Sequence, residues 1–192
     1  MTDTLKAEDV VAAAAFLGVT PAHVWAVADV ESAGSAFYAP AKPIIRMEPH
    51  HFRRLTGMRF DESHPRLSHA YSQRRRYPQP ANQSSRWVQF EEACALDRSA
   101  AIQSHSFGMF QAMGFNYRRC GFASAELFLS AHCRSAGDQL LAAAHFIKSQ
   151  NIDDELRRED WAGFAAIYNG ENYRSNSYDV KLARAYARRK RG

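Results

Sequence analysis

The stretch Ala28-Asp-Val-Glu-Ser-Ala-Gly-Ser-Ala-Phe37 places one glutamate at the end of a predicted helix, close to a glycine. Val24, Val27, Ala28 and Glu31 stand at positions i, i+3, i+4 and i+7, so the glutamate continues the apolar stripe of that helix. A carboxylate on such a stripe loses hydration, which raises its pKa, and the negative end of the helix dipole acts in the same direction. The pattern predicts that Glu31 keeps a proton near neutral pH, as a general acid does.

An ordinary surface position is the alternative for Glu31. In that case the side chain reaches water from a frayed last turn or pairs with an arginine. The helix alone leaves the two interpretations open. Gly34, which we expect to end the helix, would leave space for the backbone or a sugar of a substrate.

Helical signals dominate the rest of the chain. Thr20-Pro21 is typical of a helix start, with the threonine as cap and the proline in the first turn. Ile44-Ile-Arg-Met47 predicts one short strand of a small hairpin. We therefore expect a mainly α, α+β fold in which helices surround a cleft beside a small β-hairpin lobe. The helices are predicted at about residues 6–17, 21–32, 49–55, 86–102, 123–133, 138–150, 160–168 and 178–189.

The length and composition favour one globular domain over residues 1–192. The chain has 192 residues and is 46% hydrophobic, which is enough to bury a core, and we find no internal repeat or interdomain linker. Residues 57–84, rich in Arg, His, Ser, Gln and Pro, predict an extended irregular excursion. A loop of that length is uncommon in a compact domain unless it is functional or mobile, so it is a candidate border of a cleft.

The charge balance favours polyanionic partners, because 25 basic residues face 20 acidic ones. Arginine is concentrated in Arg74-Arg-Arg76 and in Arg188-Arg-Lys-Arg191. Nucleic acid, the bacterial envelope and acidic polymers all fit such a surface. The alternative for both runs is ordinary solvated charge, since the first precedes a Tyr-Pro-Gln-Pro loop and the second suits the negative end of a C-terminal helix.

No metal site, cofactor site or disulfide framework is encoded. Cys94, Cys120 and Cys133 are odd in number and lack a CxxC spacing, so we expect free thiols, mostly in the core. The eight histidines lack the HExxH pattern. No apolar run approaches the roughly 18 residues of a membrane span, and residues 10–17 follow an acidic opening, which is typical of a soluble helix rather than a signal peptide.

Three fragments resemble the motifs of the lysozyme superfamily in order and in wide separation. The first, Glu31-Ser-Ala-Gly-Ser-Ala-Phe37, resembles the motif of the catalytic glutamate. The second, Ser104-His-Ser-Phe-Gly-Met-Phe-Gln-Ala-Met-Gly114, resembles the Ser-x-Gly-x-x-Gln-x-Met turn and helix that lines the cleft. The third, Ala165-Ala-Ile-Tyr-Asn-Gly170, resembles the Tyr-Asn-Gly near the C-terminus.

The resemblance narrows to the N-acetylmuramidase domain of phage endolysins. Two more fragments carry it, Ile44-Ile-Arg-Met-Glu-Pro-His-His-Phe52 and Leu182-Ala-Arg-Ala-Tyr186, and it covers about Val10 to Ala187. The chain departs from the family at Ser106-Phe-Gly108, where members often have Ser-Trp-Gly, and at Met47-Glu48, where they often have Phe-Glu. The peptidoglycan-binding module often fused to this domain is missing, so the basic surface is expected to do part of its work.

This resemblance implies a lysozyme-like fold and cleavage of the β-1,4 bond between N-acetylmuramic acid and N-acetylglucosamine in peptidoglycan. Glu31 would be the proton donor, and Glu48, 17 residues later, the second carboxylate. A structural ion pair between Glu48 and Arg46 or Arg53 is the alternative. The implied substrate-binding residues are Ser106, Gly108, Gln111, Tyr168 and Asn169, and the candidate ring faces for the sugars are Phe37, Phe107 and Phe110.

Each implied role keeps a structural alternative, in which Gln111, Tyr168 and Asn169 are polar groups satisfied within the fold and the glycines are turn residues. Two other functions also stay open. One is a lytic transglycosylase, which shares the fold and the acid but releases 1,6-anhydro ends. The other is a non-catalytic protein that binds the envelope or nucleic acid through its arginine runs. No segment interleaves aromatic and basic residues as single-strand binders do, so we expect no specific nucleic acid partner.

The expected setting follows from the same reasoning. Without a signal peptide, the protein would be made in the host cytoplasm as a monomer. It would reach peptidoglycan in the periplasm or cell wall through a membrane lesion made by another protein. The basic runs would contact the anionic envelope.

Overall fold

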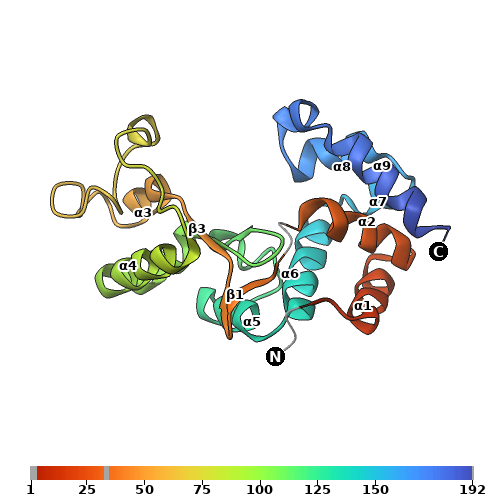
Figure 1. Ribbon diagram of the computed structural model, residues 1–192, viewed down its shortest axis with the longest axis horizontal. Helices are drawn as coiled ribbons and strands as arrows, with labels where there is room; N and C mark the ends of the chain where they lie inside the picture. Colours follow the sequence, from red (N-terminus) through yellow and green to blue (C-terminus); the bar gives the residue numbers. More distant parts are fainter. Residues whose placement is uncertain (1–3, 33–34, 192) are drawn as a thin grey trace.

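The structure is a computed structural model that describes residues 4–32 and 35–191. Gly34, the expected end of the second helix, lies outside these residues. Figure 1 shows helices in two groups on either side of a small β region, with α6 (Ala136–Ser149) near the centre. The expected mainly α fold with small sheets is confirmed.

The first group is a helical bundle with its own core. It contains α1 (Ala7–Leu17), α2 (Pro21–Glu31), α7 (Asp153–Arg157), α8 (Trp161–Tyr168) and α9 (Tyr178–Arg189), which lie to the right in Figure 1. Apolar stripes at helical spacing meet in its interior, where burial removes their side chains from water. Its largest buried side chains include Leu17, Val24, Val27, Leu140, Ile147, Leu156, Phe164 and Leu182.

The second group packs around a separate core. It contains α3 (Pro49–Leu55), α4 (Gln83–Ser104) and α5 (Ala125–Arg134) together with the main sheet. Its buried side chains include Ile45, Met47, Phe52, Phe90, Ile102, Phe107 and Phe128. Helix α6 serves both cores, since Ala142 packs in the second while Leu140 and Ala143 pack in the first. The two groups therefore meet along α6.

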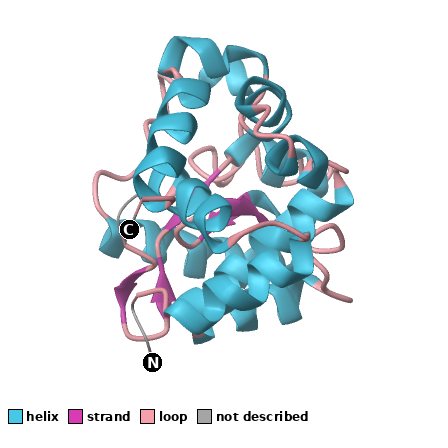
Figure 2. Ribbon diagram, turned by 90° about the vertical axis from the view of Figure 1, so that its right-hand side faces the viewer, coloured by secondary structure: helices cyan, strands magenta, loops and turns pink. Residues whose placement is uncertain are grey.

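Two small antiparallel sheets connect the groups (Figure 2). The first is a hairpin of β1 (Phe37–Ala39) and β2 (Lys42–Pro43). The second has the order β3 (Ile45–Met47), β4 (His105–Phe107) and β5 (Ala112–Met113). The strand predicted at 44–47 is confirmed, but its partner is β4, which lies about sixty residues further along the chain, rather than a neighbouring hairpin strand.

The second motif differs from the expected turn and helix. It forms β4, a tight turn, β5 and the short 3₁₀ helix η2 (Gly114–Asn116). Gly108 has φ +73° and Gln111 has φ +47°, so the chain reverses between them instead of continuing as an α-helix. A Cβ at Gly108 would lie 2.3 Å from Oε1 of Gln139, so only glycine fits this turn.

Local signals set most helix boundaries. Gly18 ends α1 with φ +69°, and its N–H bonds to the carbonyls of Ala14 and Ala15. Thr20 caps α2, with Pro21 in the first turn and the Thr20 hydroxyl 2.8 Å from Nδ1 of His23. Helices α3 and α9 have the predicted bounds, whereas α4 begins at residue 83 rather than 86. Within the described residues, the helices that were not predicted are α7, η2 and two further 3₁₀ helices, η1 (Tyr71–Gln73) and η3 (Glu171–Asn176), and strands β4 and β5 were not predicted either.

The excursion at residues 57–82 packs against its lobe. Leu67, Ser68 and His69 are buried within it. The Ser68 hydroxyl donates to Asp61 at 2.5 Å, and Asp61 also accepts from Arg53 of α3 at 2.8 Å. These contacts replace the missing regular backbone pairing, so the segment is irregular yet fixed to the lobe.

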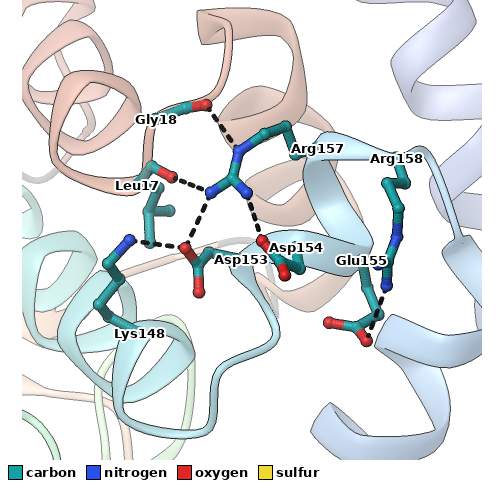
Figure 3. Close-up of polar contacts among 8 residues, drawn as sticks. All are labelled: Leu17, Gly18, Lys148, Asp153, Asp154, Glu155, Arg157 and Arg158. Atoms are coloured by element: carbon teal, nitrogen blue, oxygen red, sulfur yellow. Dashed lines mark hydrogen bonds and ion pairs between the residues drawn. The ribbon is translucent and has the colours of Figure 1, made fainter.

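Arg157 fastens α7 to the end of α1 (Figure 3). Its guanidinium donates to the carbonyls of Leu17 and Gly18 at 3.4 Å and to Asp153 at 3.0 Å. Lys148 donates to the same Asp153 oxygen at 2.6 Å. Burial raises the pKa of Asp153, but the hydrogen bonds from Lys148 and Arg157 outweigh it and the pKa is lowered overall. These contacts of the ionised Asp153 with Lys148 and Arg157 position α7 and the chain that leads from it into α8.

The C-terminal basic run is partly used within the fold. Arg189 makes two hydrogen bonds to the carboxylate of Asp29 on α2, at 2.7 and 2.9 Å, and lies over the ring of Trp25. Lys190 lies 3.9 Å from Glu159. In the described part of the chain, no single helix is long and apolar enough to cross a membrane; α1 and α2 together pass that test but are bent by 110°.

Candidate active site

Glu31 is the last residue of α2, and its carboxylate meets the end of α8. Nδ2 of Asn169 donates to both carboxylate oxygens, each at 2.9 Å. Burial raises the pKa of Glu31, while the Asn169 hydrogen bond and the charge of Lys181 offset part of that rise. Among the described residues, Oδ1 of Asn169 is buried without a partner. The apolar stripe therefore delivers a partly dehydrated carboxyl group to a polar contact, as the sequence predicts.

A pocket of about 180 Å³ begins at Tyr168, the residue before Asn169, and is lined by residues of both cores; neither Glu31 nor Asn169 lines it. Tyr168 precedes Asn169 and forms part of its wall, with its ring stacked on Phe164 at 5.2 Å. Burial raises the pKa of the Tyr168 hydroxyl, and negative charge on Glu31 or Cys120 adds to the effect. The hydroxyl stays protonated and is a hydrogen-bond donor near Glu31. The lining comprises Phe110, Gln111, Ala112, Met113, Asn116, Cys120, Ala143, Phe146 and Tyr168.

The second motif builds the opposite wall of the pocket. The Gln111 amide donates to the carbonyls of Gly108 at 2.8 Å and Ile44 at 3.3 Å, and its oxygen accepts from the Ser106 hydroxyl at 2.8 Å. Gln111 thus braces the turn while it lines the pocket. Ser106 and Gly108 do not line the pocket; they hold Gln111 in place through hydrogen bonds.

A buried glutamine on α6 joins three segments around the site. Gln139 is fully buried, and its Oε1 accepts from the backbone N–H of Met109 at 2.8 Å. Its Nε2 donates to the carbonyls of His132 at 2.9 Å and Ala36 at 3.4 Å. The amide therefore holds the turn after β4 near the segment that follows Glu31. Sequence reasoning missed Gln139, although it interrupts an apolar helix stripe as Glu31 does.

Glu48 follows β3 and caps the start of α3. Strand register pairs Arg46 with Ser106 and Ser106 with Met113, which lines the pocket. Alternation along a strand puts Glu48 on the same face as Arg46, two residues earlier. Its carboxylate lies 3.6 Å from Arg46 and 3.6 Å from His50. The alternative ion pair with Arg46 is thus present, while Arg53 pairs with Asp61.

A row of rings leads from this face to the pocket. Tyr71 contacts His50 with ring centroids 5.2 Å apart, His50 contacts His51 at 4.2 Å, and His51 contacts Phe115 at 4.8 Å. Phe115 lies between Met113 and Asn116, and it is 36% exposed. We refer to Tyr71, His50, His51 and Phe115 as the ring row. His50 and His51 belong to the fragment at residues 44–52 that carries the family resemblance, but the sequence does not predict that their rings stack.

The three phenylalanines expected to offer ring faces to the sugars do not do so at the surface. Phe107 is fully buried and Phe37 is 7% exposed, so both are core residues. Phe110 lines the pocket from within the first core. Phe107, at the position where the family resemblance led us to consider tryptophan, therefore contributes packing. Phe115 and Tyr71 offer the exposed ring faces instead.

The three cysteines are free thiols. Cys120 is buried in the pocket wall, and burial raises its pKa to about 12. Cys94 and Cys133 are half-buried on α4 and α5, and burial raises the pKa of both thiols. All three therefore stay protonated at neutral pH and are poor nucleophiles. Within residues 4–32 and 35–191, no three His, Cys, Asp or Glu side chains come together as a metal site.

Comparison with known proteins agrees with this geometry. The sequence profile of the N-acetylmuramidase family matches residues 20–190. The crystal structure of the Burkholderia AP3 phage endolysin is similar, with a TM-score of 0.88 and 31% sequence identity over 99% of this chain and 73% of the endolysin chain. A search of curated proteins gave no match. The chain belongs to the N-acetylmuramidase family and is a peptidoglycan-cleaving glycoside hydrolase.

Proposed function

We propose that the enzyme hydrolyses the β-1,4 bond between N-acetylmuramic acid and N-acetylglucosamine, with Glu31 as the general acid. The observation that supports this best is the place of the Glu31 carboxyl group, which accepts two hydrogen bonds from Asn169 next to the Tyr168 pocket; burial there also raises its pKa. A raised pKa keeps the proton on the acid until the leaving oxygen needs it.

The proposed reaction begins with proton transfer from Glu31 to the glycosidic oxygen. The bond from that oxygen to C1 of the muramic acid then breaks, leaving an oxocarbenium-like centre. Water adds to C1, and its proton passes to a carboxylate, so that a reducing end forms. Asn169 remains bonded to the ionised Glu31 and limits the rise in its pKa. The unpartnered Oδ1 of Asn169 is available to a hydroxyl or N–H of the substrate.

We assign the second carboxylate role to Glu48. Its place on the face shared with Arg46, Ser106 and Met113 supports this role. The side chain is 29% exposed, so water can reach it. Its carboxylate, 3.6 Å from both Arg46 and His50, would order the attacking water or offset positive charge at C1.

We propose that the ring row carries the glycan strand to the pocket. Sugars present C–H faces that pack on flat rings, and the exposed Tyr71 and Phe115 lie at the two ends of the row. Replacing both rings with alanine should raise KM for long glycan strands and leave kcat unchanged. The matched control is Tyr38→Ala, an exposed tyrosine on β1. Equal KM values in all three proteins would remove the row from the substrate path.

Mass spectrometry of the released muropeptides tests the proposal. Hydrolysis adds one water to each cleaved bond, whereas a lytic transglycosylase gives 1,6-anhydro products of lower mass. Digestion in water labelled with ¹⁸O should place the label on the new reducing end. Unlabelled 1,6-anhydro products would assign the enzyme to transglycosylation.

The setting of the reaction is also a proposal. We propose that the protein acts on peptidoglycan in the periplasm or cell wall, where Arg74–Arg76 contact the anionic envelope. The three arginines are exposed, and Arg74 and Arg76 lie over the rings of Tyr71 and Tyr77. The second run contributes less, because Arg189 and Lys190 already have acidic partners. Replacing Arg74–Arg76 with glutamine should reduce sedimentation of the protein with cell-wall sacculi at low salt; unchanged sedimentation contradicts this contact.

A further inference from the structure

A closed set of hydrogen bonds runs through the side-chain amide of Gln139 on α6. Nε2 of Gln139 donates to the carbonyl of Ala36 at 3.4 Å, and the same carbonyl accepts from the N–H of Ile44 at 3.3 Å. The carbonyl of Ile44 accepts from the N–H of Gly108 at 2.8 Å. Met109, the next residue, closes the set, because its N–H donates to Oε1 of Gln139 at 2.8 Å. We refer to these four hydrogen bonds as the amide network.

The amide network joins the three segments that carry the proposed acid, the proposed second carboxylate and the pocket wall. Glu31 lies five residues before Ala36, and Glu48 lies four residues after Ile44. Gln111 lies in the turn that follows β4, and its amide donates to the carbonyl of Ile44 at 3.3 Å. A shift of the central amide would therefore change the spacing between the acid, the second carboxylate and the wall.

The Gln139 amide is fixed in both place and orientation. The side chain is fully buried, and a Cβ added at Gly108 would lie 2.4 Å from its Cδ, so the turn rests directly on the amide. Nε2 also donates to the carbonyl of His132 at 2.9 Å, so both amide protons have acceptors. Turning the amide over would place its N–H groups against the N–H of Met109 and its oxygen against two carbonyls. One orientation is therefore selected.

We propose that Gln139 is a positioning residue for glycosidic bond cleavage, which sets the spacing between the Glu31 segment, the Glu48 segment and the Gln111 turn. Gln139 does not line the catalytic pocket, so it acts through the segments that it joins. A displacement of about 1 Å between reacting groups costs about 100-fold in rate. The proposal rests on the proposed roles of Glu31 and Glu48, and it assigns to the reaction a residue that lies outside all the sequence motifs.

Gln139→Glu tests the proposal, because pH turns the amide network on and off in this one variant. The protonated carboxyl group has the shape of the amide, accepts from Met109 and donates one hydrogen bond. The ionised group donates none and faces the carbonyls of Ala36 and His132, which together with burial raises its pKa. Relative to wild type at the same pH, kcat should be within about threefold at about pH 5 and lower by about 10- to 100-fold at about pH 7.5.

The Michaelis constant separates positioning from substrate binding. The lining of the catalytic pocket is unchanged in Gln139→Glu, so KM for soluble glycan strands should stay within about threefold of wild type. A constant ratio of variant to wild-type kcat between about pH 5 and 7.5 would overturn the proposal. A rise in KM that accounts for the whole loss of activity would overturn it as well.

Two further variants separate positioning from a loss of stability. Gln139→Met keeps the side-chain length but removes the hydrogen bonds and adds no charge, so kcat should be low at every pH. Ile147→Ala, on the same helix, opens a cavity in the first core away from the amide network, and it should lower Tm while leaving kcat within about twofold. All variants are compared at a temperature at which circular dichroism shows them folded. An equal loss of kcat in Ile147→Ala would show that catalysis follows the stability of α6, which would overturn the proposal.

Hydrogen exchange examines the amide network without any use of catalysis. The backbone N–H groups of Met109 and Gly108 should exchange at least about tenfold faster in Gln139→Met than in wild type, while those in α9 should be unchanged. Unchanged exchange at Met109 would overturn the proposal. Wild-type kcat in both Gln139 variants would also overturn it and leave the assignment of Glu31 intact. No release of reducing ends by the wild-type protein would instead contradict the proposed function, and the role of Gln139 with it.

Discussion

Asn169 donates both of its amide contacts to Glu31, with Nδ2 at 2.9 Å from each carboxylate oxygen. The two residues lie 138 positions apart in sequence and meet because α8 ends where α2 ends. This contact both orients the acid and limits the rise in its pKa. It makes Asn169 a positioning residue for the reaction as well as a candidate sugar contact.

Asn169→Ala should move the alkaline limb of the pH–rate profile to higher pH. The variant removes a hydrogen bond that lowers the pKa of Glu31, so the acid stays protonated further into the alkaline range. We also expect kcat to fall by about 10- to 100-fold, the usual effect of losing a hydrogen bond to a charged group. Asn176→Ala is the control, because Asn176 is exposed. An unshifted limb would mean that Asn169 does not act through Glu31.

Glu31→Gln should raise the thermal stability of the protein at neutral pH. The folded pKa of Glu31 is raised, so folding is favoured most when the carboxyl is protonated, and this contribution is lost as pH rises through the folded pKa. Glutamine removes the buried charge, and its Oε1 can still accept from Nδ2 of Asn169 as the carboxylate does. The gain in Tm should disappear below about pH 4, where the carboxyl is neutral in both states. A variant less stable than wild type at pH 7 would contradict the dehydration of Glu31.

Glu48→Gln should reduce kcat by about 100-fold or more with little change in KM, if Glu48 activates water or offsets charge at C1. Glu62→Gln, an exposed glutamate of the same lobe, is the matched control. Steady-state kinetics on soluble glycan strands give both constants. A loss of less than about threefold would instead support a mechanism with one carboxylate, for which general acid catalysis by Glu31 suffices.

Two buried histidines should make the fold sensitive to acid. Burial lowers the pKa of His105 and of His132 to about 4, although each Nδ1 lies within hydrogen-bonding distance of a backbone carbonyl. The unfolded chain takes up these protons below about pH 6.5, so stability is present above that pH and is lost as pH falls toward 4. The loss should reach about 3 kcal/mol for each histidine at pH 4. Urea unfolding at pH 7, 5.5 and 4.5 measures it, and a flat profile would contradict the burial of both rings.

Much of the fold follows from local sequence signals. Gly18, Thr20 and Pro21 mark the boundary between α1 and α2 because their preferences are local. The apolar stripe that contains Glu31 predicts a dehydrated carboxylate for the same reason. Pairing of β3 with β4 is a long-range event, and nothing in residues 44–47 identifies its partner.

The sequence identifies those candidate site residues that lie within a single short motif. The sequence and its resemblance select Glu31, Gln111, Tyr168 and Asn169, and the structure brings these four residues to one pocket and its edge. The sequence does not predict that Asn169 bonds to Glu31, because that contact needs α2 and α8 to pack together on α9. The catalytic roles of Glu31 and Glu48, the substrate-binding roles of Ser106, Gly108, Gln111, Tyr168 and Asn169, and the extent of a single domain over residues 1–192 all stay predictions.

The packing of large side chains explains the misplaced aromatic wall. Phe107 lies on β4 with its side chain in the second core, so its ring cannot reach a sugar. Tyr71 in η1 and Phe115 in η2 offer ring faces because these short helices lie against His50 and His51 of α3. Residues in such short 3₁₀ turns carry little periodicity, and this is why sequence reasoning passes over them.

Release of reducing ends from purified peptidoglycan tests the central role of Glu31 most directly. Wild-type protein, Glu31→Gln and the control Glu8→Gln, an exposed glutamate on α1, are compared at equal concentration and pH. We predict that Glu31→Gln folds normally and loses nearly all release, while Glu8→Gln matches wild type. Wild-type release by folded Glu31→Gln would contradict the assignment of the general acid.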